Sequence, residues 1–280
     1  MAILDTVKNK LSNSKFLRFT LVALVILTGI GCILYPLNVP PVMAQSALNL
    51  LPDVGIPQSD QKVLVFSPHP DDETIGVGGY IAESIKDGAD VRIVLVTNGN
   101  FHGNEQARYA EFRKATQILG VPENNLVFLG FPDRKIDKMN PTTLYAALKT
   151  QIEQYNPDIV VYPNIRDANQ DHSTIGKVVE QILKAEPHKM TAYEYLVHYE
   201  HIWPRPREFA PKLDLSPPDP LMNADTSWEK VPLSQSSENL KLEAIHMYRS
   251  QLDNDWLKGL LLSSIRRNEL IAIPKNLYTQ

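Results

Sequence analysis

The amino-acid sequence predicts an α/β protein, a Rossmann-like three-layer domain with a mostly parallel sheet, preceded by one N-terminal transmembrane helix. Two observations carry this prediction: β-type apolar runs alternate with helical stretches from residue 62 onward, and an uncharged apolar segment follows a basic N-terminus. Alternation of strand and helix is the pattern of βαβ units, whose strands pair in parallel with helices on both faces. We expect strands at 62–67, 91–96, 126–129, 158–162 and 193–199. We expect helices at 75–87, 104–120, 141–155 and 173–184.

The last part of the chain is less regular. Segment 203–237 contains seven prolines, which predicts a long irregular loop. Loops of this length in compact domains usually shape or cover a site. Helical patterns return at 238–252 and 255–264.

The N-terminal segment predicts export and a membrane anchor. Its apolar core, Phe19 to Tyr35, is preceded by four basic residues, Lys8, Lys10, Lys15 and Arg18. This core is about the minimum length that spans a bilayer, and the basic flank predicts a cytoplasmic N-terminus with the following domain on the far side. Two alternatives stay open: cleavage of a signal after Ala44, which would give a secreted protein, and lipidation at Cys32.

These features divide the chain into four parts. We expect a basic cytoplasmic N-terminus at 1–18, a transmembrane signal anchor at 19–37, a linker at 38–60 and one folded domain at 61–280. The 280 residues, 43% of them hydrophobic, suffice for one sizeable α/β domain. The formal charge is −4, of which residues 1–18 contribute +3 and 19–44 none, leaving −7 for the rest. An acidic domain is a poor binder of nucleic acid, and a single cysteine excludes a disulfide scaffold or a cysteine-rich zinc module.

A metal-binding pattern follows the first expected strand. His69 and Asp72 stand three residues apart on the predicted loop, with Asp71 between them. An imidazole and a carboxylate at this spacing can share a divalent ion, which leaves Asp71 available for proton transfer. The alternative is that these acids only cap the helix that follows, where they would face the positive end of its dipole.

A second acidic cluster strengthens the metal interpretation. Asp167, Asp171 and His172 follow the strand expected at 158–162 and precede the helix expected at 173–184. The carboxyl ends of parallel strands lie along one sheet edge, so the two loops can meet across one crevice. By contrast, His198 and His201 would point to opposite faces of a strand, so we do not expect them to share a metal.

The chain resembles the PIG-L or LmbE-like deacetylases, zinc hydrolases that remove the acetyl group from N-acetylglucosamine units of glycoconjugates. The resemblance spans Lys62 to about Ile273 and is strongest in the hexapeptide Pro68 to Glu73. Weaker agreements follow in the family's order. They are Val96 to Gly99, the helix with Arg108, Glu111 and Ala115, then Leu129 to Asp133, Lys241, His246, Ser250, Gln251 and Asn268 to Leu270.

The resemblance implies roles for individual residues. It implies that His69, Asp72 and His172 bind one Zn²⁺ and that Asp71 is the general base. It also implies that Arg108 and Asp133 contact the sugar. For Arg108, an ordinary solvated position on a helix is the alternative.

One position departs from the family's pattern. Where the family has the first His of His-any-Asp-His, this chain has Asn169, followed two residues later by Asp171. The replaced His lies near the developing oxyanion in the family, and Asn can donate a neutral hydrogen bond there but cannot carry a proton. We expect Asp171 to orient a neighbouring side chain, with helix capping as the alternative.

The predicted function is therefore that of a zinc-dependent amidohydrolase, membrane-tethered and extracytoplasmic, that removes the N-acetyl group from an N-acetylglucosamine-type unit. Its partners would be an N-acetylated sugar or glycolipid and, through the anchor, the membrane. An exported sugar-binding protein with little or no turnover is the alternative that Asn169 raises, and a metal-dependent phosphoesterase is a third possibility. We expect no nucleotide cofactor, because Gly76, Gly78 and Gly79 lack the dinucleotide spacing.

Overall fold

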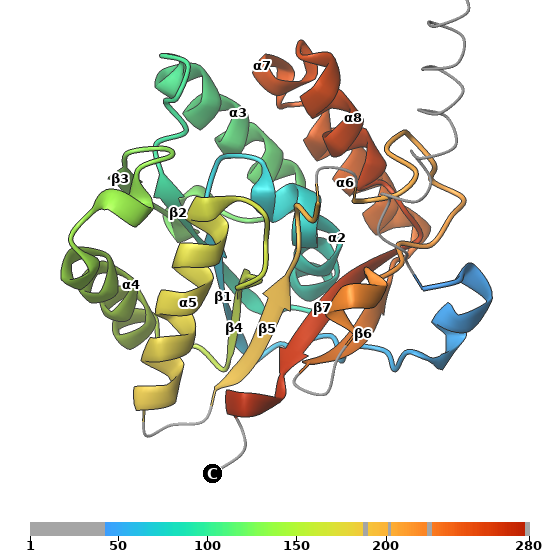
Figure 1. The fold of residues 1–280 in the computed structure, drawn as a ribbon, viewed down its shortest axis with the longest axis horizontal. Helices are drawn as coiled ribbons and strands as arrows, with labels where there is room; N and C mark the ends of the chain where they lie inside the picture. The colour runs from blue at the N-terminus through green and yellow to red at the C-terminus, as the bar shows by residue number, and fades with distance from the viewer. Residues whose placement is uncertain (1–42, 187–189, 201–202, 223–225, 278–280) are drawn as a thin grey trace, which may run out of the picture. The chain divides into compact units, whose positions relative to one another are not determined.

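The computed structural model describes residues 43–186, 190–200, 203–222 and 226–277. Within these ranges, seven strands form one sheet in the order β3-β2-β1-β4-β5-β7-β6, with helices on both faces (Figure 1). The strands are β1 (Lys62–Ser67), β2 (Asp90–Thr97), β3 (Leu126–Phe131), β4 (Ile159–Pro163), β5 (Thr191–Tyr195), β6 (Thr226–Pro232) and β7 (Asn268–Pro274). The helices are α2 (Asp72–Lys86), α3 (Glu105–Ile118), α4 (Pro141–Tyr155), α5 (Gln170–Ala185), α6 (Gln235–Ile245), α7 (Arg249–Leu252) and α8 (Asp255–Ser263).

The sheet is parallel from β3 to β5 and antiparallel at its other edge. β1 lies between β2 and β4, and both pairings are parallel. β7 pairs antiparallel with β5 and with β6. This arrangement confirms the predicted α/β class with a mostly parallel sheet.

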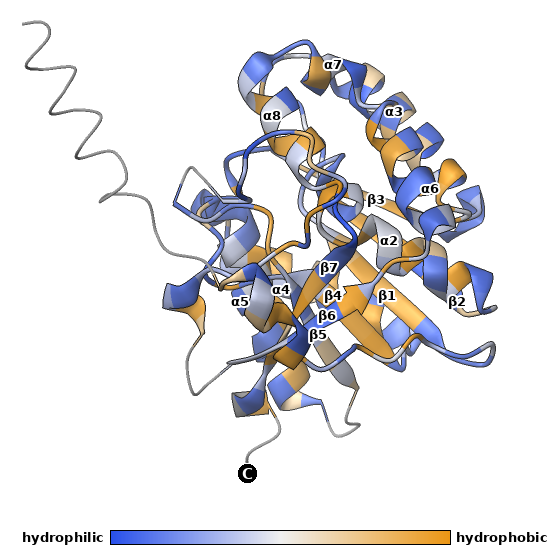
Figure 2. Ribbon diagram, turned by 90° about the vertical axis from the view of Figure 1, so that its right-hand side faces the viewer, coloured by the Kyte–Doolittle hydropathy of each residue, from blue (hydrophilic) through white to orange (hydrophobic). Residues whose placement is uncertain are grey.

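Both faces of the sheet are covered because successive strand residues point to opposite sides. In β1, Val63 and Val65 enter a core shared with α2 and α3, whereas Leu64 and Phe66 enter a second core under α4 and α5. Strands β1 and β4 are accordingly apolar over most of their length, while the helices mix apolar and polar residues (Figure 2). This is the pattern of parallel strands buried on both faces.

Helix α2 is interrupted one turn after the predicted metal loop. Val77 has non-helical angles (φ −142°, ψ 22°). A buried ion pair satisfies the backbone groups freed there, since Lys241 Nζ donates to Ile75 O at 2.9 Å and Glu269 accepts from Gly79 N at 2.7 Å. The glycines after the motif serve close packing, because a Cβ on Gly76 would lie 2.2 Å from the Tyr195 ring.

The structure corrects three details of the predicted secondary structure. Segment 203–237 is not irregular throughout, since it contains β6, which pairs with β7 over seven residues. The helix expected at 238–252 is divided into α6 and α7. Helix α5 begins at Gln170 instead of residue 173, so that Asp171 lies in its first turn.

The predicted membrane anchor at 19–37 lies outside the described residues. Among the residues that the structure does describe, no helix has the length and apolar character needed to cross a bilayer. The described end of the predicted linker packs on the domain: Leu48 and Val54 are buried, and Val54 N donates to Lys230 O of β6 at 2.8 Å. This part of the segment is therefore not a free spacer.

Candidate active site

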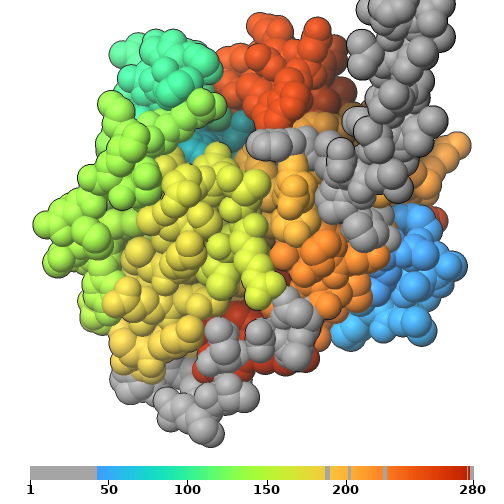
Figure 3. All heavy atoms as spheres, in the orientation of Figure 1, coloured from blue at the N-terminus to red at the C-terminus, as the bar shows by residue number. Residues whose placement is uncertain are grey.

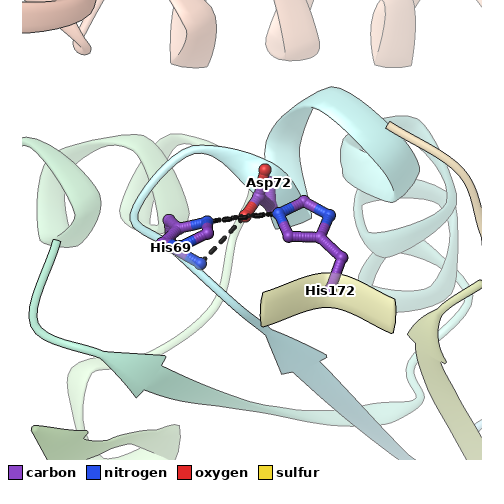
Figure 4. Close-up of side chains that lie close together, drawn as sticks. All are labelled: His69, Asp72 and His172. Atoms are coloured by element: carbon purple, nitrogen blue, oxygen red, sulfur yellow. Dashed lines mark hydrogen bonds and ion pairs between the residues drawn. The ribbon is translucent and has the colours of Figure 1, made fainter. Parts of the chain in front are cut away.

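The two predicted loops meet at the carboxyl ends of β1 and β4. These strands are neighbours in the sheet, yet the chain leaves β1 toward β2 on one side and returns to β4 on the other. Such a reversal opens a crevice between the two loops, which is the usual ligand site of open α/β sheets. His69 reaches the crevice from the loop after β1, Asp72 from the first turn of α2 and His172 from the first turn of α5 (Figure 4).

Three ligand atoms converge in this crevice. Asp72 Oδ2 lies 3.0 Å from His69 Nδ1 and 2.9 Å from His172 Nε2. The two ring nitrogens are 3.1 Å apart, and all three side chains are buried. Two nitrogens and one oxygen at these separations match the ligand set of a zinc site that keeps a fourth position open.

The opposite nitrogens of both imidazoles face carboxylates. His69 Nε2 lies 3.2 Å from Asp133 Oδ1 and 3.2 Å from Asp171 Oδ2. His172 Nδ1 lies 3.3 Å from Asp167 Oδ2, within ion-pair range but without a well-formed hydrogen bond. Negative charge at these positions favours a proton on the outer nitrogens, so that His69 Nδ1 and His172 Nε2 could offer their lone pairs to a cation bound beside Asp72. The residues therefore fit a divalent cation.

The pKa shifts in the crevice also fit a site for a divalent cation. Burial lowers the pKa of His172, but Asp72 and Asp167 outweigh that effect and raise the pKa to about 9. For Asp72 burial acts in the opposite direction and raises the pKa, but His172 and His69 hold this pKa well below its usual range. In the absence of a cation, protons on the imidazoles thus balance the negative charge of the buried carboxylates. A bound cation would displace these protons.

Among the residues that the structure describes, two other trios of possible ligands each share one imidazole with this site. They are Asp167, His172 and His198, and His69, Asp133 and Asp171. Asp167 already accepts backbone N–H bonds from Val197 and His198 at 2.9 Å. Asp171 likewise accepts from Arg134 N at 2.7 Å. Asp72 Oδ2 also accepts a backbone bond, from His69 N at 2.9 Å, so this occupancy does not separate the carboxylates. Asp72 is the best placed to bind a metal because its Oδ2 lies 3.0 Å from His69 Nδ1 and 2.9 Å from His172 Nε2.

Asp71 stands beside the trio in a strained conformation. Its φ of 137° is one that L-residues rarely adopt, and strain of this kind gathers at functional sites. Burial raises the pKa of Asp71 to about 8 although the Arg108 guanidinium opposes the shift. Arg108 Nη2 donates to Asp71 Oδ2 at 3.1 Å and to Pro70 O at 2.6 Å.

Arg108 and Asp133 both lie at the site. Arg108 is 7% exposed, which contradicts the alternative of a solvated helix position. Asp133 Oδ2 lies 4.0 Å from Arg108 Nη1, while its other oxygen faces His69. Asp133 thus shares its carboxylate between an imidazole and the arginine.

For Asp171 the sequence leaves two roles open, orienting a neighbouring side chain and capping the helix. In the structure the cap of α5 is Asn169, and Asp171 contacts an imidazole. Asn169 is the N-cap of α5, where its Oδ1 accepts from Asp171 N at 2.9 Å, and it also lines the cavity. With Oδ1 engaged, its NH₂ group is the part able to donate to a ligand. Asp171 Oδ2 lies 3.2 Å from Nε2 of His69, so it is placed to orient an imidazole of the other loop.

A cavity of about 240 Å³ lies above these residues. Its floor includes His69, Asp71 and Asp72. Its walls come from the loop after β2 with Phe101, the segment after β5 with Trp203 and Arg207, and α8 with Trp256 and Leu260. The molecular surface is hollowed where α3, α8 and the start of α5 approach one another (Figure 3).

Sequence reasoning missed two residues of this site. The sequence gives Asp167 no role beyond its place in the acidic cluster, yet the loop after β4 puts its carboxylate against His172. His198 lines the cavity, and its Nδ1 lies 3.2 Å from Asp167 Oδ1. The position of Asp167 in an acidic cluster after a strand was a usable signal, whereas no local pattern marks His198. The strand on which the separation of His198 and His201 was expected ends at Tyr195, before His198, and His201 lies outside the described residues.

Comparison with known proteins agrees with this geometry. Residues 64–183 match the family model described as PIG-L, GlcNAc-PI de-N-acetylase. A probable N-acetyl-alpha-D-glucosaminyl L-malate deacetylase 2 of Bacillus anthracis is 26% identical over 179 residues, 55% of this chain and 78% of that protein. A diacetylchitobiose deacetylase of Thermococcus kodakarensis is 33% identical over 113 residues, 37% of this chain and 41% of that protein.

Solved structures share the fold. The N,N'-diacetylchitobiose deacetylase from Pyrococcus horikoshii superposes with a TM-score of 0.58 at 19% identity, covering 78% of this chain and 86% of that one. A deacetylase of the A40926 pseudoaglycone gives a TM-score of 0.57 at 17% identity, covering 77% of this chain and 97% of that one.

Proposed function

Because residues 64–183 of this chain form a PIG-L family domain, we propose that the protein is a zinc-dependent hydrolase that removes the N-acetyl group from an N-acetylglucosamine-type unit of a glycoconjugate. His69, Asp72 and His172 would hold one Zn²⁺. The observation that carries this proposal is the convergence of their three ligand atoms while carboxylates face the opposite ring nitrogens. The relatives and structural neighbours named deacetylases support the reaction class.

Zinc bound by these three residues would supply a Lewis acid and a water of lowered pKa. The remaining steps belong to the chain's own side chains. Asp71 accepts the proton of the attacking water, and Arg108 holds the Asp71 carboxylate toward the cavity. Asn169 donates from its NH₂ group to the amide oxygen as negative charge develops.

Collapse of the tetrahedral species requires an acid for the leaving amine. Asp71 is the simplest candidate, because it has just taken a proton and lies on the cavity floor. Bond changes then balance: water adds to the carbonyl carbon, the C–N bond breaks, and the amine receives the proton that water lost. The products are acetate and the free amino sugar.

The alternative is an exported sugar-binding protein of the same fold with little or no turnover. Asn169 favours it, because this residue replaces an imidazole with a side chain that does not titrate. Acetate release from N-acetylglucosamine conjugates by the zinc-loaded protein distinguishes the two functions. Turnover that disappears in Asp71→Asn while zinc stays bound supports the hydrolase, and sugar binding without any acetate release supports the binding protein.

For location, we propose an extracytoplasmic domain tethered through 19–37, with cleavage after Ala44 as the alternative. The support is the basic flank followed by an uncharged apolar segment. Cell fractionation tests it: intact chain should stay in membranes washed with high salt, and the domain should be cut by protease added from outside. A soluble fragment beginning at Gln45 would instead establish a cleaved signal.

A further inference from the structure

Gln251 lies on the wall of the cavity, and the reaction steps above do not use it. It belongs to α7, lines the cavity together with Asp71 and Trp256, and is 7% exposed. Its side-chain NH₂ group donates to Ser250 Oγ at 2.8 Å. Among the residues that the structure describes, none donates to Gln251 Oε1, and this oxygen is not sealed inside the protein. Oε1 is therefore the acceptor that this side chain can offer to a ligand.

A chain of hydrogen bonds fixes the orientation of the Gln251 amide. Glu111 of α3 accepts from Ser250 N at 2.8 Å and from Ser250 Oγ at 2.7 Å. The one hydroxyl proton of Ser250 is thereby used, so Ser250 Oγ can only accept from Gln251. A flipped amide would place Oε1 against Ser250 Oγ with no proton between the two oxygens. The NH₂ end is thus held at Ser250, and this leaves Oε1 for the cavity that Gln251 lines.

The backbone of Gln251 is tied to the loop that carries Asp71. Gln251 N donates to Tyr248 O at 3.0 Å. The Tyr248 side chain is fully buried, and its hydroxyl donates to Glu73 Oε1. Glu73 Oε2 in turn accepts from Asp71 N at 3.3 Å. One buried network therefore sets the position of Gln251 relative to Asp71.

The acetamide that the proposed function places in this cavity offers one acceptor, its carbonyl oxygen, and one donor, its N–H. The carbonyl oxygen would meet the metal and the NH₂ group of Asn169, which leaves the N–H to be paired. The Asp133 carboxylate is already engaged, by His69 at 3.2 Å and by Phe101 N at 3.3 Å. Gln251 Oε1 is a neutral acceptor with no other partner, and it suits a neutral N–H donor.

We propose that Gln251 is a catalytic residue that accepts a hydrogen bond from the N–H of the amide to be cleaved. The proposal rests on the proposed function, because it requires the acetamide beside Asp71. The nitrogen becomes pyramidal as the carbonyl carbon becomes tetrahedral, and an N–H held by Gln251 fixes the side on which the nitrogen lone pair forms. That lone pair then takes the proton from Asp71 and the C–N bond breaks. The original N–H proton stays on nitrogen, and Gln251 is unchanged.

The test compares two acetylated sugars on the zinc-loaded protein. One is methyl 2-acetamido-2-deoxyglucoside, and the other is methyl 2-O-acetylglucoside, which has an ester oxygen in place of the N–H. Each variant is compared with the parent on the same substrate, because the ester is intrinsically more reactive. In Gln251→Met, kcat/KM for acetate release should fall about tenfold or more with the amide and change less than about twofold with the ester, since only the amide loses a hydrogen bond.

A second variant tests the orientation of the Gln251 amide. Ser250→Ala keeps Gln251 but removes the hydroxyl that holds its NH₂ group, so it should lower kcat/KM for the amide and not for the ester. It carries the test if Gln251→Met does not fold. Gln117→Met is the matched control, because Gln117 is exposed on α3 and does not line the cavity. This control should change neither substrate.

The outcomes separate failure of the inference from failure of the proposed function. Equal losses for the amide and the ester in Gln251→Met would overturn the contact with the N–H and leave the hydrolase standing. If the parent releases acetate from neither sugar, the proposed function fails, and binding of both sugars is then followed by tryptophan fluorescence. A preference for the amide that disappears in Gln251→Met would support the contact, whereas the same ratio of affinities in parent and variant would overturn it.

Discussion

Asp171 Oδ2 lies 3.2 Å from Nε2 of His69, a residue 102 positions earlier in the chain. The same carboxylate accepts the backbone N–H of Arg134 at 2.7 Å. One side chain of α5 therefore joins the loop after β1 to the loop after β3, and it orients an imidazole of the opposite loop instead of its sequence neighbour His172.

This contact predicts a loss of zinc affinity when Asp171 is truncated. Asp171→Ala should weaken zinc binding about 10- to 100-fold. Without the Asp171 carboxylate, the His69 ring is no longer held in one orientation with its proton on Nε2. Competition with a chromogenic chelator measures the change. Asp137→Asn, an exposed acid on the nearby segment, should bind zinc as the parent does. Unchanged affinity in Asp171→Ala would show that the contact does not tune the metal site.

Asp71→Asn should abolish most turnover without releasing zinc. Loss of a general base typically costs about 10² to 10⁴ in rate, and Asp71 is not among the three converging ligand atoms. Acetate release and zinc content should be measured on the same preparation. Normal kcat in a zinc-loaded Asp71→Asn protein would remove Asp71 from the mechanism.

Two substitutions can separate the two functions of Asn169, which are capping of α5 and hydrogen-bond donation to the substrate. Asn169→Asp keeps the oxygen that caps α5 but loses the NH₂ donor, whereas Asn169→Ala loses both. Each variant should lower kcat by about 10² to 10³, the usual cost of an oxyanion donor. Only Asn169→Ala should also lose about 1 kcal/mol of stability through the cap. Thermal unfolding and acetate release together check this, and full activity in both variants would leave Asn169 with capping alone.

Glu194 is a buried acid that lies away from the catalytic crevice, and it should make the stability of the fold depend on pH. Burial, reinforced by Glu180, raises the pKa of Glu194 to about 8 from an ordinary value of 4.5. The folded protein then binds a proton that the unfolded chain has released, so stability falls as pH rises from 4.5 toward 8. Glu194→Gln should flatten this decline in Tm, whereas Glu243→Gln at an exposed position of α6 should not. Parallel Tm profiles for the parent and Glu194→Gln would show that Glu194 does not titrate in that range.

The amino-acid sequence alone determined the parallel part of the sheet and the helices that connect its strands. Continuous apolar runs such as Lys62 to Phe66 and the helical periods between them depend on local pattern, and they predicted β1 to β5 and α2 to α5 within a few residues. The chemistry at two strand ends also followed from local order, because parallel strands bring their carboxyl ends to one edge. That is why His69, Asp72 and His172 could be expected to meet.

Only the tertiary structure decided which residues surround His69, Asp72 and His172. Strand β6 lies in a proline-rich stretch with little apolar alternation, and it forms because β7 offers an edge to pair with. The partner of Asp171, the place of Asp167 behind His172 and the pairing of Arg207 with Trp256 each join residues from separate elements. Such contacts depend on how loops pack across the sheet edge, and no periodicity within one segment encodes them.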